Sequence, residues 1–120
     1  GFAGVDGERI YDLAGVFAGE ARMPARRMLG YVVGTSAAEN PMGQAGFRGH
    51  EFHYSGVRLS PATRYAYRLS RGGGIQDGLD GALQDQTIAS YTHLHPVTSR
   101  GMFAHFVDCC REVSASRGIA

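Results

Sequence analysis

One stretch near the C-terminus, residues 88–96, restricts the possible fold more than any other part of this sequence. It reads Ile-Ala-Ser-Tyr-Thr-His-Leu-His-Pro, and its β-branched and aromatic residues predict a β-strand. Pro96 has no backbone N–H to donate, so the strand should end there. Because successive side chains point to opposite faces of a strand, Tyr91, His93 and His95 should share one face.

A helix should follow this strand after a short turn. Thr98 and Ser99 are favourable N-cap residues. They precede an apolar stripe at three- and four-residue spacing, made of Met102, Phe103, Phe106, Val107, Cys110 and Val113. Gly118 is a suitable stop for the helix. Since open α/β sheets place functional groups where a strand gives way to a helix, His93 is the leading candidate for chemistry.

The rest of the chain is predicted to consist of strands joined by loops and turns. The strands cover residues 8–17, 27–35, 47–59 and 63–71, with loops at 19–24 and 36–46. The last of these strands alternates well and is typical of a half-buried antiparallel strand with Tyr65, Tyr67 and Leu69 on one face.

The glycine run at residues 72–74 suggests a phosphate-binding loop at first sight. However, no Gly-Lys-Ser/Thr follows it, and residues 75–81 predict no helix. A plain turn is therefore the better interpretation.

A second histidine-bearing motif, Gly-His-Glu-Phe-His-Tyr-Ser, occupies residues 49–55. On a strand, one face would carry Glu51, His53 and Ser55. The opposite face would carry His50 and two aromatic residues. These polar side chains could simply form local hydrogen bonds beside a core, or they could share a pocket with the other histidine-bearing strand.

These histidines could serve two kinds of chemistry. A metal site has suitable nitrogen and oxygen donors, but the spacing matches no compact metal motif. A nucleophilic enzyme would have a base in His93 but no evident nucleophile, because Cys109 and Cys110 lie inside the predicted helix, away from an electropositive helix N-terminus. A metal-dependent enzyme and a non-catalytic small-molecule binding module both remain alternatives.

Composition argues against several kinds of partner. The net charge is +1, so no general attraction to nucleic acid is implied. No apolar run approaches the length of a membrane span, so no membrane association is expected. The two adjacent cysteines cannot form an ordinary disulfide with each other, which favours a reducing, cytoplasmic location.

The two histidine-bearing motifs together resemble the paired signatures of the cobyrinate a,c-diamide synthase family. Residues 49–55 and the stretch Ala-Ser-Tyr-Thr-His-Leu-His at 89–95 carry the resemblance. Arg-Gly-Gly-Gly-Ile at 71–75 and Asp80-Gly81 also look like this family. The resemblance extends over residues 11–113 and leans towards the archaeal branch, which includes the nickel-sirohydrochlorin a,c-diamide synthases.

The resemblance implies an α/β fold, the C-terminal part of a flavodoxin-like class I glutamine amidotransferase domain, with a mixed sheet and a closing C-terminal helix. Such a domain hydrolyses glutamine through a cysteine thioester and passes ammonia to an ATP-dependent synthetase domain. That N-terminal domain then amidates the a and c acetates of a tetrapyrrole. The implied partners are glutamine, the synthetase domain and the tetrapyrrole, with ATP and Mg bound outside this chain and no cofactor within it.

Residue roles follow from the same resemblance. His93 matches the catalytic histidine, the base and acid for the cysteine. The expected substrate-binding residues are Glu51, His53, Tyr54 and Ser55. His95 and Tyr91 are expected to support the base, and no metal ligand is implied.

Two features depart from the usual class I pattern. The ordinary His-x-Glu pair is His-x-His here. The cobalamin-type branch looks similar in lacking that acid, so this departure fits the branch. The nucleophile's Glu-Cys-Gly-Gly turn would end about where Gly1-Phe2 stands. We therefore expect residues 1–120 to be a single domain, a C-terminal fragment without the nucleophile turn or the ATP-binding domain. It should be inactive alone and should self-associate, with the Tyr65/Tyr67/Leu69 face contributing.

Overall fold

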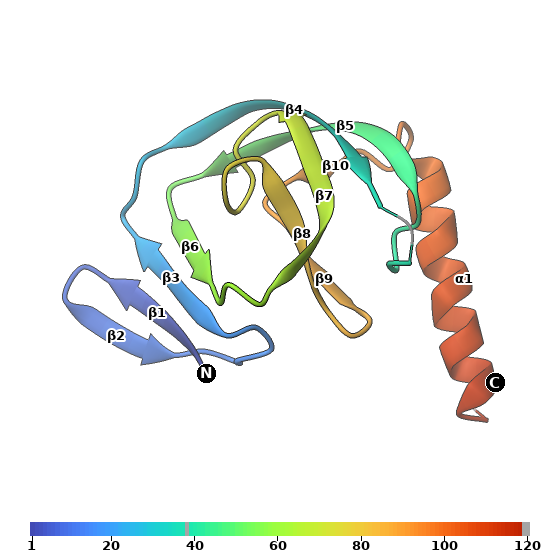
Figure 1. Ribbon diagram of the computed structural model, residues 1–120, viewed down its shortest axis with the longest axis horizontal. Coiled ribbons are helices and arrows are strands. Elements are labelled where there is room, and N and C mark those ends of the chain that lie inside the picture. Colours follow the sequence, from blue (N-terminus) through green and yellow to red (C-terminus); the bar gives the residue numbers. More distant parts are fainter. Residues whose placement is uncertain (38, 119–120) are drawn as a thin grey trace.

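The computed structural model describes residues 1–37 and 39–118, which form two β-sheets and one long C-terminal helix (Figure 1). The four-stranded sheet has the order β2-β1-β3-β6 and contains β1 (Phe2–Asp6), β2 (Arg9–Asp12), β3 (Gly19–Met23) and β6 (Gly56–Leu59). The six-stranded sheet has the order β10-β5-β4-β7-β8-β9. Its strands are β4 (Met28–Ser36), β5 (Ala45–His53), β7 (Arg64–Arg71), β8 (Leu79–Gln84), β9 (Thr87–Ala89) and β10 (His93–Leu94). Helix α1 is Arg100–Ser116.

The predicted α/β architecture, with a mixed sheet and a C-terminal helix, is confirmed. Among the described strands, β1 and β3 pair in parallel, whereas the remaining pairs are antiparallel. The longest ladder joins β4 to β5 over nine residue pairs. Paired residues of antiparallel strands lie directly opposite each other, with their side chains on the same face of the sheet. The register of this ladder therefore determines which side chains of β5 lie beside those of β4.

The core lies on the inner face of the six-stranded sheet. It is built from Val32, Met42, Phe47, Ala66, Tyr67 and Met102. The rings of Phe47 and Tyr67 lie 4.8 Å apart, tilted at 56°. Tyr67 is 2% exposed and Leu69 packs against the same cluster. Tyr67 is therefore interior, whereas Tyr65 and Leu69 are half-buried, and the contribution of this face to self-association stays a prediction.

The N-terminal third departs most from the sequence-based strand boundaries. Of the strand predicted over 8–17, only β2 forms. Strand β1 lies where no strand was predicted, and β3 lies in the predicted loop over 19–24. Neither Phe-Ala-Gly-Val-Asp nor Gly-Glu-Ala-Arg-Met has strong strand propensity. Both strands form because β3 finds hydrogen-bonding partners on both sides, β1 and the distant β6, and such long-range pairing leaves no local signal.

The single strand predicted over 47–59 is divided into β5 and β6 by a short turn at Tyr54 and Ser55. His53 contributes to this break, because its Nδ1 lies 3.1 Å from the carbonyl oxygen of Ser55. A bond between a side chain and the backbone two residues away competes with the sheet ladder. Ala25 donates its N–H to the carbonyl of Tyr54 and holds the turn from outside.

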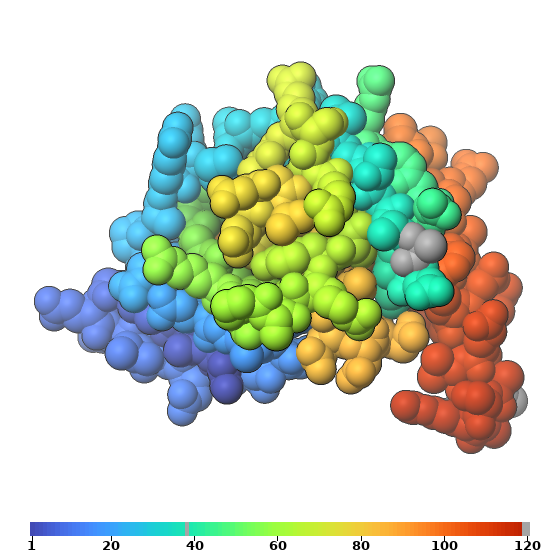
Figure 2. Space-filling model, viewed as in Figure 1, coloured from blue at the N-terminus to red at the C-terminus, as the bar shows by residue number. Residues whose placement is uncertain are grey.

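Helix α1 confirms the predicted helix, and Gly118 follows it with a φ of 69°, as a glycine stop requires. Its apolar stripe is only partly used. Met102 is 3% exposed and belongs to the core, whereas Phe106, Val107 and Val113 are 40–45% exposed. The C-terminal half of the helix stands away from the sheets, which Figure 2 shows in the space-filling view.

Candidate active site

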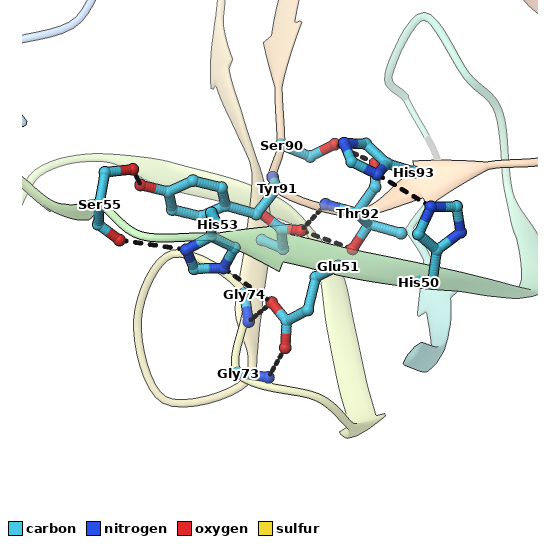
Figure 3. Close-up of polar contacts among 11 residues, drawn as sticks. His50, Glu51, His53, Ser55, Gly73, Gly74, Ser90, Tyr91, Thr92 and His93 are labelled. Atoms are coloured by element: carbon cyan, nitrogen blue, oxygen red, sulfur yellow. Dashed lines mark hydrogen bonds and ion pairs between the residues drawn. The ribbon is translucent and has the colours of Figure 1, made fainter. Parts of the chain in front are cut away.

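The two histidine-bearing motifs meet where β10 pairs with the middle of β5. The partners are His93 with His50 and Leu94 with Gly49. Glycine is needed at position 49 because an added Cβ would lie 2.4 Å from the carbonyl oxygen of His93. The pairing brings His93 Nδ1 within 3.1 Å of His50 Nε2, and both rings are exposed to solvent (Figure 3).

A second cluster lies on the opposite, inner face of β5. Glu51 is 3% exposed, and its carboxylate lies 3.2 Å from His53 Nε2. The ring of His53 stacks on that of Tyr91 with centroids 3.5 Å apart, and the Tyr91 hydroxyl hydrogen-bonds to Ser55 Oγ. Both partners of the His53 ring, a carboxylate and a carbonyl, are acceptors, so only the imidazolium form donates to both.

The glycine turn at 72–74 completes this inner cluster. The backbone N–H groups of Gly73 and Gly74 donate to the Glu51 carboxylate at 2.8 and 3.2 Å. Gly74 has a φ of 64°, and a Cβ there would lie 2.7 Å from the Leu79 carbonyl oxygen. The amides that a phosphate would need are thus already bound to a carboxylate, which supports the plain-turn prediction.

Asp80 interrupts the strand predicted over 88–96. Its side chain is fully buried and accepts hydrogen bonds from Tyr91 N at 3.1 Å, Thr92 N at 2.9 Å and Thr92 Oγ1 at 2.6 Å. These amides no longer face a neighbouring strand, so β9 ends at Ala89 and β10 begins at His93. The interruption also places Tyr91 and His93 on opposite faces of β5, whereas the sequence predicted one shared face.

The pKa values of Tyr65 and Tyr67 are raised in the folded protein. Burial, and to a lesser degree the Asp80 charge, raises the pKa of Tyr67 from 10.0 to about 12. The same two causes raise the pKa of Tyr65.

Two of the predicted site residues lie apart from both clusters. Tyr54 is 46% exposed and packs edge-on against Phe52, with ring centroids 5.3 Å apart. His95 accepts a hydrogen bond at Nδ1 from Val97 N at 3.1 Å, while its carbonyl oxygen accepts from Ser99 N. His95 therefore organises the turn that leads into α1.

The two cysteines offer no competing catalytic pair. Cys109 Sγ lies 3.6 Å from His105 Nδ1 on the same helix. That nitrogen lies 3.1 Å from the carbonyl oxygen of Pro41, an acceptor, and so must carry a hydrogen. A nitrogen that is already protonated cannot take the proton of a thiol.

Within residues 1–37 and 39–118, no group of three or more His, Cys, Asp or Glu side chains is arranged to hold a metal ion. The same residues contain no helix long and apolar enough to cross a membrane.

Sequence reasoning missed three residues that shape the site: His50, Asp80 and Thr92. The alternation predicts His50 on the strand face away from Glu51, but the residue that it meets on the neighbouring strand cannot be predicted from one motif alone. In the sequence, Asp80 is marked only as one half of an Asp-Gly pair. The burial of its carboxylate depends on residues 91 and 92, eleven and twelve positions further along the chain.

The fold and these motifs define a domain of the glutamine amidotransferase type. Residues 3–100 match the family model of the CobB/CobQ-like glutamine amidotransferase domain, and the chain belongs to that family. The sequence is 36% identical over 113 residues to the cobyrinate a,c-diamide synthase of Methanosarcina barkeri, covering 92% of this chain. It is 40% identical over 98 residues to the synthase of the same name from Methanothermobacter thermautotrophicus, covering 79% of this chain.

A relative with a different name is also similar. The hydrogenobyrinate a,c-diamide synthase of Mycobacterium bovis is 33% identical over 99 residues, covering 81% of this chain. The chain spans only 21–23% of the length of these three relatives.

Proposed function

We propose that this chain supplies the histidine half of the glutaminase site of a tetrapyrrole a,c-diamide synthase. The observation that carries the proposal is the position of His93. Its ring is exposed on a strand whose start is determined by the buried Asp80, and its Nδ1 contacts His50. Among the described residues, none hydrogen-bonds to Nε2, so that nitrogen is free to meet a thiol.

The chemistry that His93 would perform is proton transfer. Its Nε2 takes the proton of a cysteine thiol, and the thiolate adds to the side-chain amide carbon of glutamine. The resulting imidazolium returns the proton to the leaving nitrogen, which departs as ammonia and leaves a thioester. His93 then removes a proton from water, whose attack releases glutamate and the free thiol. The thiol would come from the part of the synthase outside these residues.

The inner cluster would support the site and contribute less to direct substrate contact. The Glu51 oxygens are already occupied by Gly73, Gly74 and His53. Tyr91 lies in the break between β9 and β10, where its N–H donates to Asp80, and its ring stacks on His53 of β5. The cluster therefore links β5 to the segment that carries His93. Substrate binding by Glu51, His53, Tyr54 and Ser55 remains a prediction.

The acceptor of the ammonia is proposed from the names of the relatives. Cobyrinate and hydrogenobyrinate are tetrapyrroles with acetate side chains a and c, which this enzyme class would convert to amides. ATP and Mg would activate these carboxylates in the synthetase domain. We also propose a cytoplasmic location, because Cys109 and Cys110 are free thiols.

The decisive test is the His93→Ala substitution in a complete synthase that contains these residues. Glutamine-dependent amidation should fall by roughly 10²- to 10⁴-fold, because a general base is removed. Turnover with free ammonia should persist, since it bypasses the thioester. If both activities fell equally, His93 would be structural. His95→Ala provides the matched comparison and should cost less, because the His95 ring binds the turn at Val97.

A further inference from the structure

The contact between His93 and His50 identifies a residue with no assigned role. His93 Nδ1 and His50 Nε2 lie 3.1 Å apart, and the rings meet edge to face at 69° with centroids 4.8 Å apart. The two residues are directly opposed in the β10–β5 ladder. The backbone register therefore holds the rings in contact, although both are exposed to solvent.

We propose that His50 is the positioning residue that orients His93, in the place that a carboxylate occupies in ordinary catalytic triads. This inference rests on the proposed function of His93 as the base. A base needs a second group that holds its ring and its tautomer. His95 stands where that acid usually lies, but its Nδ1 is engaged by Val97 N. Glu51 lies on the opposite face of β5 and is occupied by the glycine turn.

The tautomers follow from the two nitrogens in contact. For Nε2 of His93 to accept a proton, its hydrogen must be on Nδ1, which then donates to Nε2 of His50. His50 must accept there and so carries its own hydrogen on Nδ1. When His93 becomes an imidazolium, the same hydrogen bond becomes charge-assisted and stronger. A neutral imidazole stabilises that cation less than a carboxylate would, yet its nitrogen can accept the hydrogen bond that orients the ring.

Histidine ¹⁵N chemical shifts of the 120-residue chain test this assignment independently of catalysis. His93 should show a protonated Nδ1 and an unprotonated Nε2. His50→Leu should abolish this preference, because an imidazole that has lost its partner tends to populate both tautomers. His50→Gln should restore it, since the amide oxygen can accept the hydrogen bond. His95→Ala is the control and should leave the His93 shifts in place. A protonated Nε2 on His93, or a tautomer unaffected by His50→Leu, would overturn the proposal.

Kinetics of the complete synthase then connect the pair to turnover. His50→Leu should lower kcat for glutamine hydrolysis by about tenfold to a hundredfold, the range for one hydrogen bond to a charged group. KM for glutamine should change little, and His50→Gln should recover most of the rate. An unchanged kcat would remove His50 from the mechanism. If the tautomer result holds but His93→Ala leaves glutaminase activity intact, the pair exists and the proposed function fails.

Discussion

Each of the two histidine-bearing motifs contributes residues to both faces of β5. His50 and Glu51 are adjacent in sequence, yet one meets His93 at the surface and the other is buried against Gly73. A strand separates neighbouring side chains in this way because its period is two residues. The surface pair is suited to proton transfer, whereas the buried carboxylate is suited to holding a turn.

Tyr67 makes a residue-scale prediction about alkaline stability. Its pKa is raised from 10.0 in the unfolded chain to about 12 in the folded protein. The stabilisation is fully present below pH 10 and is lost as the pH rises from 10 towards 12, because the unfolded state releases the proton first. The free energy of unfolding, measured by urea denaturation, should therefore fall over this range.

The Tyr67→Phe variant checks the cause of this alkaline loss. Its free energy of unfolding should decline less steeply between pH 10 and 12 than that of the wild type. Tyr65→Phe should flatten the profile less, because its ring is only partly buried. Equal slopes in the wild type and Tyr67→Phe would show that another group causes the loss.

Among the elements, the break between β9 and β10 decides where the site lies. A continuous strand would place Tyr91 and His93 on one face, as the pattern of residues suggests. The backbone N–H groups of Tyr91 and Thr92 donate to Asp80 instead of to a neighbouring strand, and the Thr92 hydroxyl adds a third hydrogen bond. The strand then resumes at His93 on a different neighbour, because β9 pairs with β8 and β10 pairs with β5.

Asp80→Asn should show how strongly this break depends on a buried carboxylate. The amide has one acceptor oxygen, and its NH₂ group would face donors, so at least one hydrogen bond to the charged group is lost. We expect the free energy of unfolding to fall by about 2–4 kcal/mol, measured by urea denaturation. Glutamine-dependent turnover of a complete synthase should fall as well, because the backbone directly before His93 is no longer held in place by Asp80.

The exposed Asp85 provides a matched control for this variant. It lies in the β8–β9 turn with a φ of 53°, a conformation that asparagine also adopts. Asp85→Asn should change stability by less than about 0.5 kcal/mol. A similar cost for both variants would contradict a special role for Asp80.

At the scale of the whole molecule, apolar side chains remain exposed on the outer face of β4 and β5. Leu29 is 63% exposed, Tyr31 71% and Phe52 47%. Leu29 and Phe52 are opposed in the ladder, as are Tyr31 and His50, so the four side chains share one face. This outer face is more exposed than the Tyr65/Tyr67/Leu69 face, in which Tyr67 is buried, and is therefore the better candidate for self-association.

Sedimentation measurements on the 120-residue chain test this candidate. We expect concentration-dependent association that is reduced by Tyr31→Glu, because a charge would be buried in the contact. Ile10→Glu is the comparison, since Ile10 is 72% exposed on β2 of the other sheet. A chain that stays monomeric at high concentration would contradict the prediction, as would a stronger effect of Ile10→Glu.

The sequence by itself determined the elements with local signals. The β4 and β7 strands, the glycine turn and α1 could all be predicted, because alternation, glycine runs and helical spacing act within a few residues. The two signatures likewise identified the amidotransferase family and pointed to His93.

Only the tertiary structure decided which side chains meet. The β10–β5 register joins His93 to His50, and the buried Asp80 separates His93 from Tyr91. The long-range partners of β3 turn a segment of weak propensity into a strand. Each of these outcomes depends on pairing between distant segments, and no pattern within a single segment carries information about its partner.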